Sequence, residues 1–298
     1  MTTEIMTIDT NNFNAMAQAM GMSADVSDNK SKASTLARLR INHSPIMGQT
    51  EVKGKKVNVE AASGGTYKLQ IPEGETYYGS EIKIRPYLQR FMYKRFIKGH
   101  GDQPNKYVKT VMSNDLNIDL KDNDGGFNCG KPAGYIQDFK ALPQETQDLI
   151  RQIKRVRVLF GTVEIVDPTN ESGDEVSVDA MPFIWEIDNR DAFKDVGSVF
   201  NTLAKQKRLP VNHMMSATTE EQKLPNGNSF YLPRVNLDMT NSLEVTTEEH
   251  TRFADFLSWI ENYNEYIINQ YNTRAIERNA EDEDVFAQDI VDIDIEED

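Results

Sequence analysis

The stretch that most constrains the fold of this chain runs from residue 82 to residue 98 and reads IKIRPYLQRFMYKRFIK. Its residues divide onto two faces with the period of two that an extended strand requires. Pro86 argues against a helix, because proline lacks a backbone N–H and restricts the residue before it. One face of the predicted strand carries Lys83, Arg85, Tyr87, Gln89, Phe91, Tyr93 and Arg95. The other face, typical of a core wall, carries Ile82, Ile84, Pro86, Leu88, Met92 and Phe96, interrupted by Arg90 and Lys94.

The first of these faces alternates cations with aromatic rings and contains no acid. Cations follow a phosphate backbone, and flat rings stack on unpaired bases whatever their sequence. The face therefore predicts a surface for single-stranded DNA, with Tyr87, Phe91 and Tyr93 as the stacking rings. The alternative is an ordinary solvated face of a sheet, since Tyr and Phe are also good strand formers.

Two neighbouring stretches add cations to this prediction. Lys106 and Lys109 belong to a predicted returning strand, and Arg155 and Arg157 alternate with valines over residues 154–160. The sequence leaves open whether this second basic strand lies on the same surface. The candidate nucleic-acid-binding residues are Lys83, Arg85, Tyr87, Phe91, Tyr93, Arg95, Lys106, Lys109, Arg155 and Arg157.

The net charge of −14 argues against a nucleic-acid partner until its distribution is considered. Residues 281–298 hold ten acids and no Lys or Arg, which leaves 33 basic and 37 acidic residues in the rest of the chain. Residues 82–109 hold eight Lys or Arg and a single acid, Asp102. Screening confines the field of a charge to ~10 Å at ordinary salt, so a basic stripe can bind a polyanion on an acidic protein.

Composition divides the chain into three parts. Residues 1–34 are rich in Thr, Asn, Ser, Met and Ala and predict a mostly disordered N-terminal arm. Residues 35–280 predict an α+β, β-rich core, a small barrel or sheet with added helices over residues 191–208 and 246–278. Thr246, with Glu249 three residues on, predicts a capping box at the start of the second helix. The Asn226-Gly227 pair predicts a hairpin turn. Residues 281–298 predict a disordered acidic tail, because ten acids without counter-charges repel one another.

The segment from Lys30 to Arg40, at the border of arm and core, mixes cations with Ser and Thr and holds no acid. Three interpretations stay open for it: a basic arm on DNA, a docking segment for a neighbouring subunit, and a solvated lead-in to the first strand.

The acidic tail interleaves its acids with Val285, Phe286, Ile290, Val291, Ile293 and Ile295. A tethered polyanion near a basic groove has a high effective concentration there. We therefore expect the tail to compete with DNA for the groove and to dock protein partners through its apolar residues. The alternative is a solubility tail with incidental apolar residues.

Several classes of site are absent from the sequence. Cys129 is the only cysteine, which excludes an intrachain disulfide and predicts a reducing, cytoplasmic setting. The four histidines are scattered, so no zinc site is expected. A calcium loop fails because aligning Gly125 with the invariant glycine puts Leu120 and Lys131 at the first and last ligand positions.

No Ser/His/Asp or Cys/His arrangement is present, which predicts a non-enzymatic protein without cofactor. No apolar run approaches the ~20 residues of a membrane span.

The arrangement of basic arm, cationic–aromatic strand and acidic tail resembles phage single-stranded-DNA-binding proteins, the replication proteins of T7-like and T4-like viruses. The resemblance implies an OB-fold core, a role in DNA replication, recombination and repair, and residence in the host-cell cytoplasm. It implies that replication proteins such as polymerase, helicase or primase dock on residues 281–298. Residues 30–40 resemble the basic Ser/Thr stretches that promote cooperative binding in the T4-like members. Self-association is therefore a further expectation. The tail differs from T7-like relatives in lacking a terminal aromatic residue, and the zinc ligands of T4-like relatives are absent.

Two other functions compete with this one. A phage virion or scaffold protein would also be β-rich, acidic and free of motifs. A metal-dependent nuclease needs carboxylates that converge on a divalent cation with a lysine nearby, and Glu73, Glu81 and Lys83 match that pattern only faintly.

Overall fold

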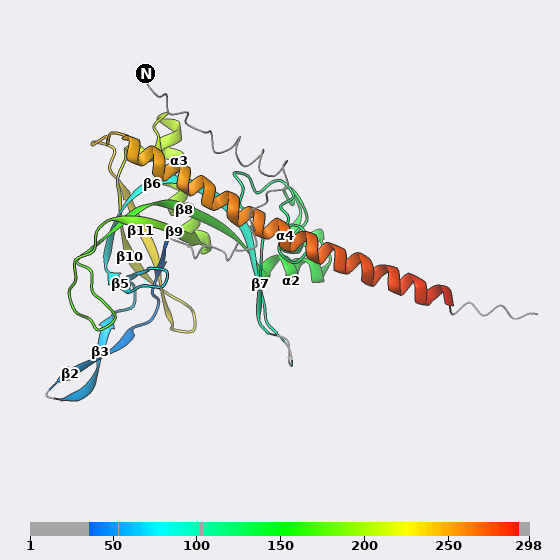
Figure 1. The fold of residues 1–298 in the computed structure, drawn as a ribbon, viewed down its shortest axis with the longest axis horizontal. Coiled ribbons are helices and arrows are strands. Elements are labelled where there is room, and N and C mark those ends of the chain that lie inside the picture. The colour runs from blue at the N-terminus through cyan, green and yellow to red at the C-terminus, as the bar shows by residue number, and fades with distance from the viewer. Residues whose placement is uncertain (1–35, 53, 100, 102–103, 292–298) are drawn as a thin grey trace, which may run out of the picture. The chain divides into compact units, whose positions relative to one another are not determined.

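The computed structural model describes residues 36–52, 54–99, 101 and 104–291. The predicted arm, residues 1–34, lies outside this part of the chain. The described chain is α+β and rich in strand, as predicted (Figure 1). Its strands are β1 (Ala37–Ile41), β2 (Ile46–Val52), β3 (Lys55–Ala62), β4 (Tyr67–Gln70), β5 (Thr76–Gly79), β6 (Glu81–Ile97), β7 (Lys106–Lys109), β8 (Ile153–Val166), β9 (Met181–Ile187), β10 (Met215–Lys223) and β11 (Ser229–Leu237). Its helices are α2 (Gln144–Gln152), α3 (Arg190–Lys205) and α4 (Thr247–Val291), with short 3-10 turns η2 (Asn128–Gly130), η3 (Phe139–Ala141) and η4 (Pro210–Asn212).

Nine strands form one sheet in the order β11-β10-β6-β8-β9-β1-β4-β5, and β7 pairs with β6 beside this path. The only parallel pair in the described sheet joins β1 to β9, and β2 with β3 makes a separate hairpin. Within the described residues the sheet does not close into a barrel, because its path ends at β11 and β5. Of the predicted alternatives, an open sheet is therefore the one observed.

Each face of the sheet is covered by one long helix. On one face, α3 buries Val196, Val199, Phe200 and Leu203 against a core that includes Ile82 and Ile84 of β6. Asn189 caps this helix and accepts hydrogen bonds from the backbone N–H groups of Asp191 and Ala192. On the other face, α4 buries Phe256 and Ile260 against Leu88 and Met92 of β6. Figure 1 shows α4 running across the sheet over β6 and β8.

The strand predicted over residues 82–98 is observed as β6, but its two faces exchange in the middle. Between Pro86 and Leu88 the register against β8 shifts, and Tyr87 is the extra residue of a bulge. Because side chains alternate strictly along a strand, one extra residue moves all later residues to the opposite faces. The predicted single apolar face is therefore wrong beyond Pro86. Gly161 stands opposite the bulge, where a Cβ would come within 2.3 Å of the Arg85 carbonyl oxygen.

Helix α4 begins as the sequence predicts and ends later. The backbone N–H of Thr246 donates to Glu249 Oε2 at 2.9 Å, which confirms the predicted capping box. The helix was expected to end near Arg278, yet its backbone continues to Val291. Residues 281–291 of the predicted disordered tail are therefore helical, and residues 292–298 lie outside the described part.

The hairpin predicted at the Asn226-Gly227 turn is confirmed as β10–β11, with Gly227 at a φ of 85°. In the part of the chain that the structure describes, no helix combines the length and the apolar character needed to cross a membrane.

Candidate nucleic-acid interface

Two of the three predicted stacking rings are buried. Tyr87 and Tyr93 are 4% and 3% exposed. The ring of Tyr87 packs edge-on against Phe256 of α4 with centroids 5.4 Å apart. The hydroxyl of Tyr93 donates to the Leu116 carbonyl at 2.9 Å. Neither ring is exposed to stack on a base, because the bulge turns Tyr87 toward α4 and the 111–129 region covers Tyr93.

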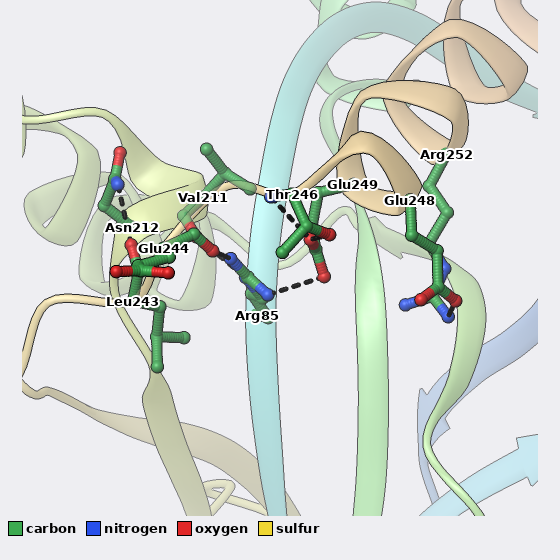
Figure 2. A network of polar contacts seen from close by, with 9 residues as sticks. All are labelled: Arg85, Val211, Asn212, Leu243, Glu244, Thr246, Glu248, Glu249 and Arg252. Carbon is green, nitrogen blue, oxygen red and sulfur yellow. Dashed lines mark hydrogen bonds and ion pairs between the residues drawn. The ribbon is translucent and has the colours of Figure 1, made fainter.

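Arg85, also predicted to contact DNA, is bound within the protein (Figure 2). Its Nε donates to the Val211 carbonyl at 2.8 Å, its Nη1 to Glu249 Oε1 at 2.8 Å and its Nη2 to the Glu244 carbonyl at 2.5 Å. Hydrogen bonds from Thr246 and the charge of Arg85 hold the pKa of the Glu249 carboxyl below its ordinary value. Arg85 therefore anchors the start of α4 to β6 rather than facing solvent.

Two more predicted residues lie beside acids at the surface. Lys83 is 3.6 Å from Glu164 at the start of β6, and Lys106 Nζ is 2.6 Å from Asp124 at the far end. The remaining predicted residues divide between the two faces of the sheet. Lys109 lies on the face covered by α4, whereas Phe91, Arg95, Arg155 and Arg157 lie on the face covered by α3.

On the α4 face, three lysines stand in direct register on neighbouring strands. Lys109 of β7 is opposite Lys94 of β6, and Lys94 is opposite Lys154 of β8. We call these three residues the lysine row. Adjacent strands are ~4.8 Å apart, so the row places three ammonium groups on a line across the strands. The row continues through β9 toward Arg38 and Arg40, whose exposed side chains alternate with buried Ala37 and Leu39 of β1.

Two carboxylates allow like charges to stand opposite one another, an arrangement that is otherwise destabilising. Glu186 of β9 accepts from Lys94 at 3.1 Å and from Lys109 at 3.2 Å, and Asp188 accepts from Lys154 at 3.1 Å. Burial favours the protonated form of Glu186, but Lys109 and Lys94 hold the pKa of this carboxyl below its ordinary value.

A groove of about 810 Å³ lies over the lysine row. We call it the lysine groove. Its lining includes five cationic side chains and two carboxylates, namely Arg38, Arg40, Lys94, Lys109, Lys154, Glu186 and Asp188. One wall is α4, which contributes Trp259 stacked on Tyr263 with centroids 5.8 Å apart.

Exposed aromatic rings stand at the β7 end of the lysine groove. Tyr107 lines the groove and is 53% exposed, and its ring lies 5.0 Å from that of Phe96, which is 44% exposed. Lys94 Nζ lies 5.2 Å from the centroid of Tyr107. Cations and exposed rings therefore lie together here, as the sequence predicts for the strand. Lys94 and Phe96, however, come from the face of the strand that the sequence predicts to be a core wall.

On the α3 face, arginines cover the phenylalanine rings. The Arg157 guanidinium lies 5.0 Å from the centroid of Phe91 and 4.4 Å from that of Phe193, and Arg155 lies 5.8 Å from Phe193. Arg157 is 7% exposed, and its Nε donates to the Phe193 carbonyl at 3.2 Å. Burial lowers the pKa of Arg157 to about 10. A Cβ at Gly197 of α3 would come within 2.3 Å of Arg157 Nη2, so the glycine makes room for the guanidinium.

Arg95 and Lys131 border this cluster. Arg95 Nε donates to Gln152 Oε1 at 3.4 Å, and Lys131 Nζ lies 5.5 Å from the centroid of Tyr93. We call Arg95, Lys131, Arg155 and Arg157, with Phe91 and Phe193, the arginine face. Across the described residues none of its four cations lies within 4.0 Å of a carboxylate oxygen.

The 119–134 loop that carries Lys131 is held by one buried carboxylate. Asp122 Oδ1 accepts from the backbone N–H groups of Asp124 and Gly126, and Oδ2 accepts from that of Cys129. Asp122 thus organises backbone in the loop whose spacing failed as a calcium site. The Cys129 thiol is buried, and burial raises its pKa.

Sequence reasoning missed most of the lysine groove. Lys94 and Lys154 were visible only as cations, and Phe96 was placed in the core wall. The alternation of Arg38 and Arg40 with apolar residues was a usable signal within the basic segment 30–40. Their meeting depends on strand register, which the local pattern does not contain.

Comparison of the chain with protein-family models, with curated proteins and with solved structures finds no match to any of them.

Proposed function

We propose that this protein binds single-stranded DNA in the lysine groove, without enzymatic action, in DNA replication, recombination and repair of the phage type. The observation that carries the proposal is the direct register of Lys109, Lys94 and Lys154 beside the exposed ring pair of Phe96 and Tyr107. A line of ammonium groups follows a phosphate backbone, and exposed rings accept bases of any kind.

The proposed preference for single strands rests on the exposed rings of Phe96 and Tyr107. Bases in a duplex already stack on one another, so Tyr107 gains a stacking partner only from an unpaired strand. Trp259 of α4 lines the opposite side of the same groove, where its ring stacks on Tyr263. The preference therefore depends on the exposed rings of Phe96 and Tyr107, which come from β6 and β7.

The proposal includes an OB-type origin for the sheet, as the resemblance implied. The β10–β11 hairpin reaches back to the β1–β4 end of the sheet: the Tyr67 hydroxyl donates to the Thr218 carbonyl at 3.0 Å. A partly open barrel is what an OB-fold presents, and strand contacts of this kind support that interpretation.

The test is a titration of fluorescent single-stranded and duplex DNA of equal length at two salt concentrations. Tighter binding of the single strand, weakened by salt, is expected. The paired variant Arg40→Ala/Lys154→Ala should lose affinity. Lys55→Ala/Lys56→Ala, which removes the same charge from the projecting β2–β3 hairpin, should not (Figure 1).

Three results would contradict the proposal. Equal affinity for duplex and single strand would remove the stacking argument. Magnesium-dependent cleavage of the DNA would favour the nuclease. Absence of DNA binding together with assembly into large particles would favour a virion or scaffold protein.

A further inference from the structure

The arginine face offers little to a nucleobase and much to a carboxylate. The rings of Phe91 and Phe193 already have guanidinium groups against them, so their faces are occupied. A guanidinium stacked on a ring still presents planar donors that bind carboxylates in a bidentate way. The partly exposed rings add an apolar border. This chemistry fits an acidic peptide that carries apolar side chains.

The chain contains such a peptide at its C-terminal end. Residues 281–298 combine ten acids with the six apolar residues named above and hold no Lys or Arg. Three cations of the arginine face, Arg95, Lys131 and Arg155, are partly or fully exposed and have no carboxylate partner among the described residues. Arg157 is buried beneath them. The composition of this segment is complementary to the arginine face in charge and in apolar content.

Helix α4 carries the acidic segment away from the sheet of its own copy. The buried side of the helix includes Phe256, Ile260 and Ile267, and the ring of Tyr271 still packs on Phe127 at 5.5 Å. Ile276 is then 69% exposed, and the helix continues to Val291 beyond the sheet (Figure 1). A helix rises 1.5 Å per residue, so residues 276–291 extend for about 24 Å.

We propose that the acidic C-terminal segment of one copy docks on the arginine face of a second copy. Such a contact joins two different surfaces, so a pair of copies keeps one free donor segment on one copy and one free acceptor face on the other. Contacts of this type build open chains. The lysine row lies on the opposite face of the sheet and stays free for another ligand. This inference goes beyond the proposed function and does not depend on DNA binding.

The test measures self-association of the full-length protein without DNA, by sedimentation velocity over a concentration series at low salt. Wild-type protein should associate, and added salt should weaken the association. Arg95→Glu/Arg155→Glu should lower the association constant at least about tenfold, since like charges then face each other. A full-length variant with all ten acids of 281–298 changed to their amides should show the same loss.

Mixing the two variants gives the sharpest result. The first variant retains the acidic segment and the second retains the arginine face, so together they should form pairs that cannot grow further. A groove variant, Lys94→Glu/Lys154→Glu, should associate as the wild type does. Circular dichroism and thermal melting verify that each variant is folded.

Four outcomes would overturn the inference: wild-type protein that stays monomeric at every concentration, association unchanged by both arginine substitutions, no pairing in the mixture, or loss of association in the groove variant. The last would place the segment in the lysine groove. These measurements of self-association need no DNA. Self-association can therefore be absent while the protein binds DNA, and DNA binding can be absent while the protein associates.

Discussion

The two faces of the sheet at the end of β6 carry similar residue types and use them differently. On the α4 face, each lysine of the row is held by a carboxylate while the rings of Phe96 and Tyr107 are exposed. On the α3 face, the arginines lack carboxylate partners in the described chain while their guanidinium groups cover the rings. Lys94 and Arg95, or Lys154 and Arg155, are neighbours in sequence and belong to different surfaces. Composition alone thus does not define a binding surface; the pairing of each charge and the freedom of each ring do.

The largest effect that separates the faces is expected at Arg157. Arg157→Ala should lower the free energy of unfolding by ~2–4 kcal/mol, because it empties a buried site between two rings and removes the hydrogen bond from Arg157 Nε to the Phe193 carbonyl. Urea unfolding measures the change. Arg155→Ala, at an exposed position, should stay within ~0.5 kcal/mol of wild type. Equal losses for both would break the distinction between a buried and an exposed arginine on this face.

The next effect concerns one ring on each face. Tyr107→Ala should weaken binding of single-stranded DNA by ~1–3 kcal/mol if its exposed ring stacks on a base. Phe91→Ala should leave the affinity of the folded protein nearly unchanged, although the sequence placed Phe91 among the stacking rings. Fluorescence anisotropy gives both values, with Tyr135→Ala as the control, since Tyr135 is 85% exposed and lies outside the lysine groove. A larger loss at Phe91 than at Tyr107 would move the DNA to the arginine face.

How far the sequence predicts this molecule is visible in β6 itself. The strand, its extent and its mixture of cations and rings follow from the local alternation. The exchange of its faces does not, because it depends on one extra residue, Tyr87, and on Gly161 of another strand. The capping box at Thr246 and the Asn-Gly hairpin are predictable because each is made by residues a few positions apart in the sequence. The lysine row is not predictable, because it joins β7, β6 and β8 by long-range register.

A smaller effect concerns one cation from each face. Lys154→Ala should reduce the slope of log affinity against log salt by about 0.7, the value for one phosphate contact on a single strand. Arg155→Ala removes the same charge one residue along the chain and should leave the slope unchanged. Titrations at four or more salt concentrations measure both slopes. A loss of slope in the Arg155 variant alone would contradict binding in the lysine groove.

The smallest effect is expected at Glu186, the carboxylate that holds two lysines of the row. Its pKa is lowered in the folded protein, so its stabilising contribution is present above its unfolded pKa of ~4.3 and is lost as pH falls through the folded value. Glu186→Gln should therefore destabilise the protein near neutral pH by at most ~1 kcal/mol, and the difference from wild type should shrink in acid.

The same substitution frees Lys94 and Lys109, so it should tighten DNA binding at low salt. Urea unfolding between pH 3 and pH 7 and one low-salt titration measure the two results. Glu164→Gln, at the exposed partner of Lys83, is the control and should change neither quantity. Weaker DNA binding by the Glu186 variant would show that the carboxylate positions the lysines rather than masking them.

The parallel pairing of β1 with β9 has a consequence for how the protein is made. It brings Leu39 beside Trp185, which is 146 residues further along the chain. Contacts between such distant residues form late, because chain closure must be paid in entropy before they form, and sheets built on them fold in milliseconds to seconds. Arg38 and Arg40 reach the lysine groove only through this pairing, and Trp259 of its wall is translated later still. A chain whose synthesis has not yet passed Trp259 therefore lacks the complete groove.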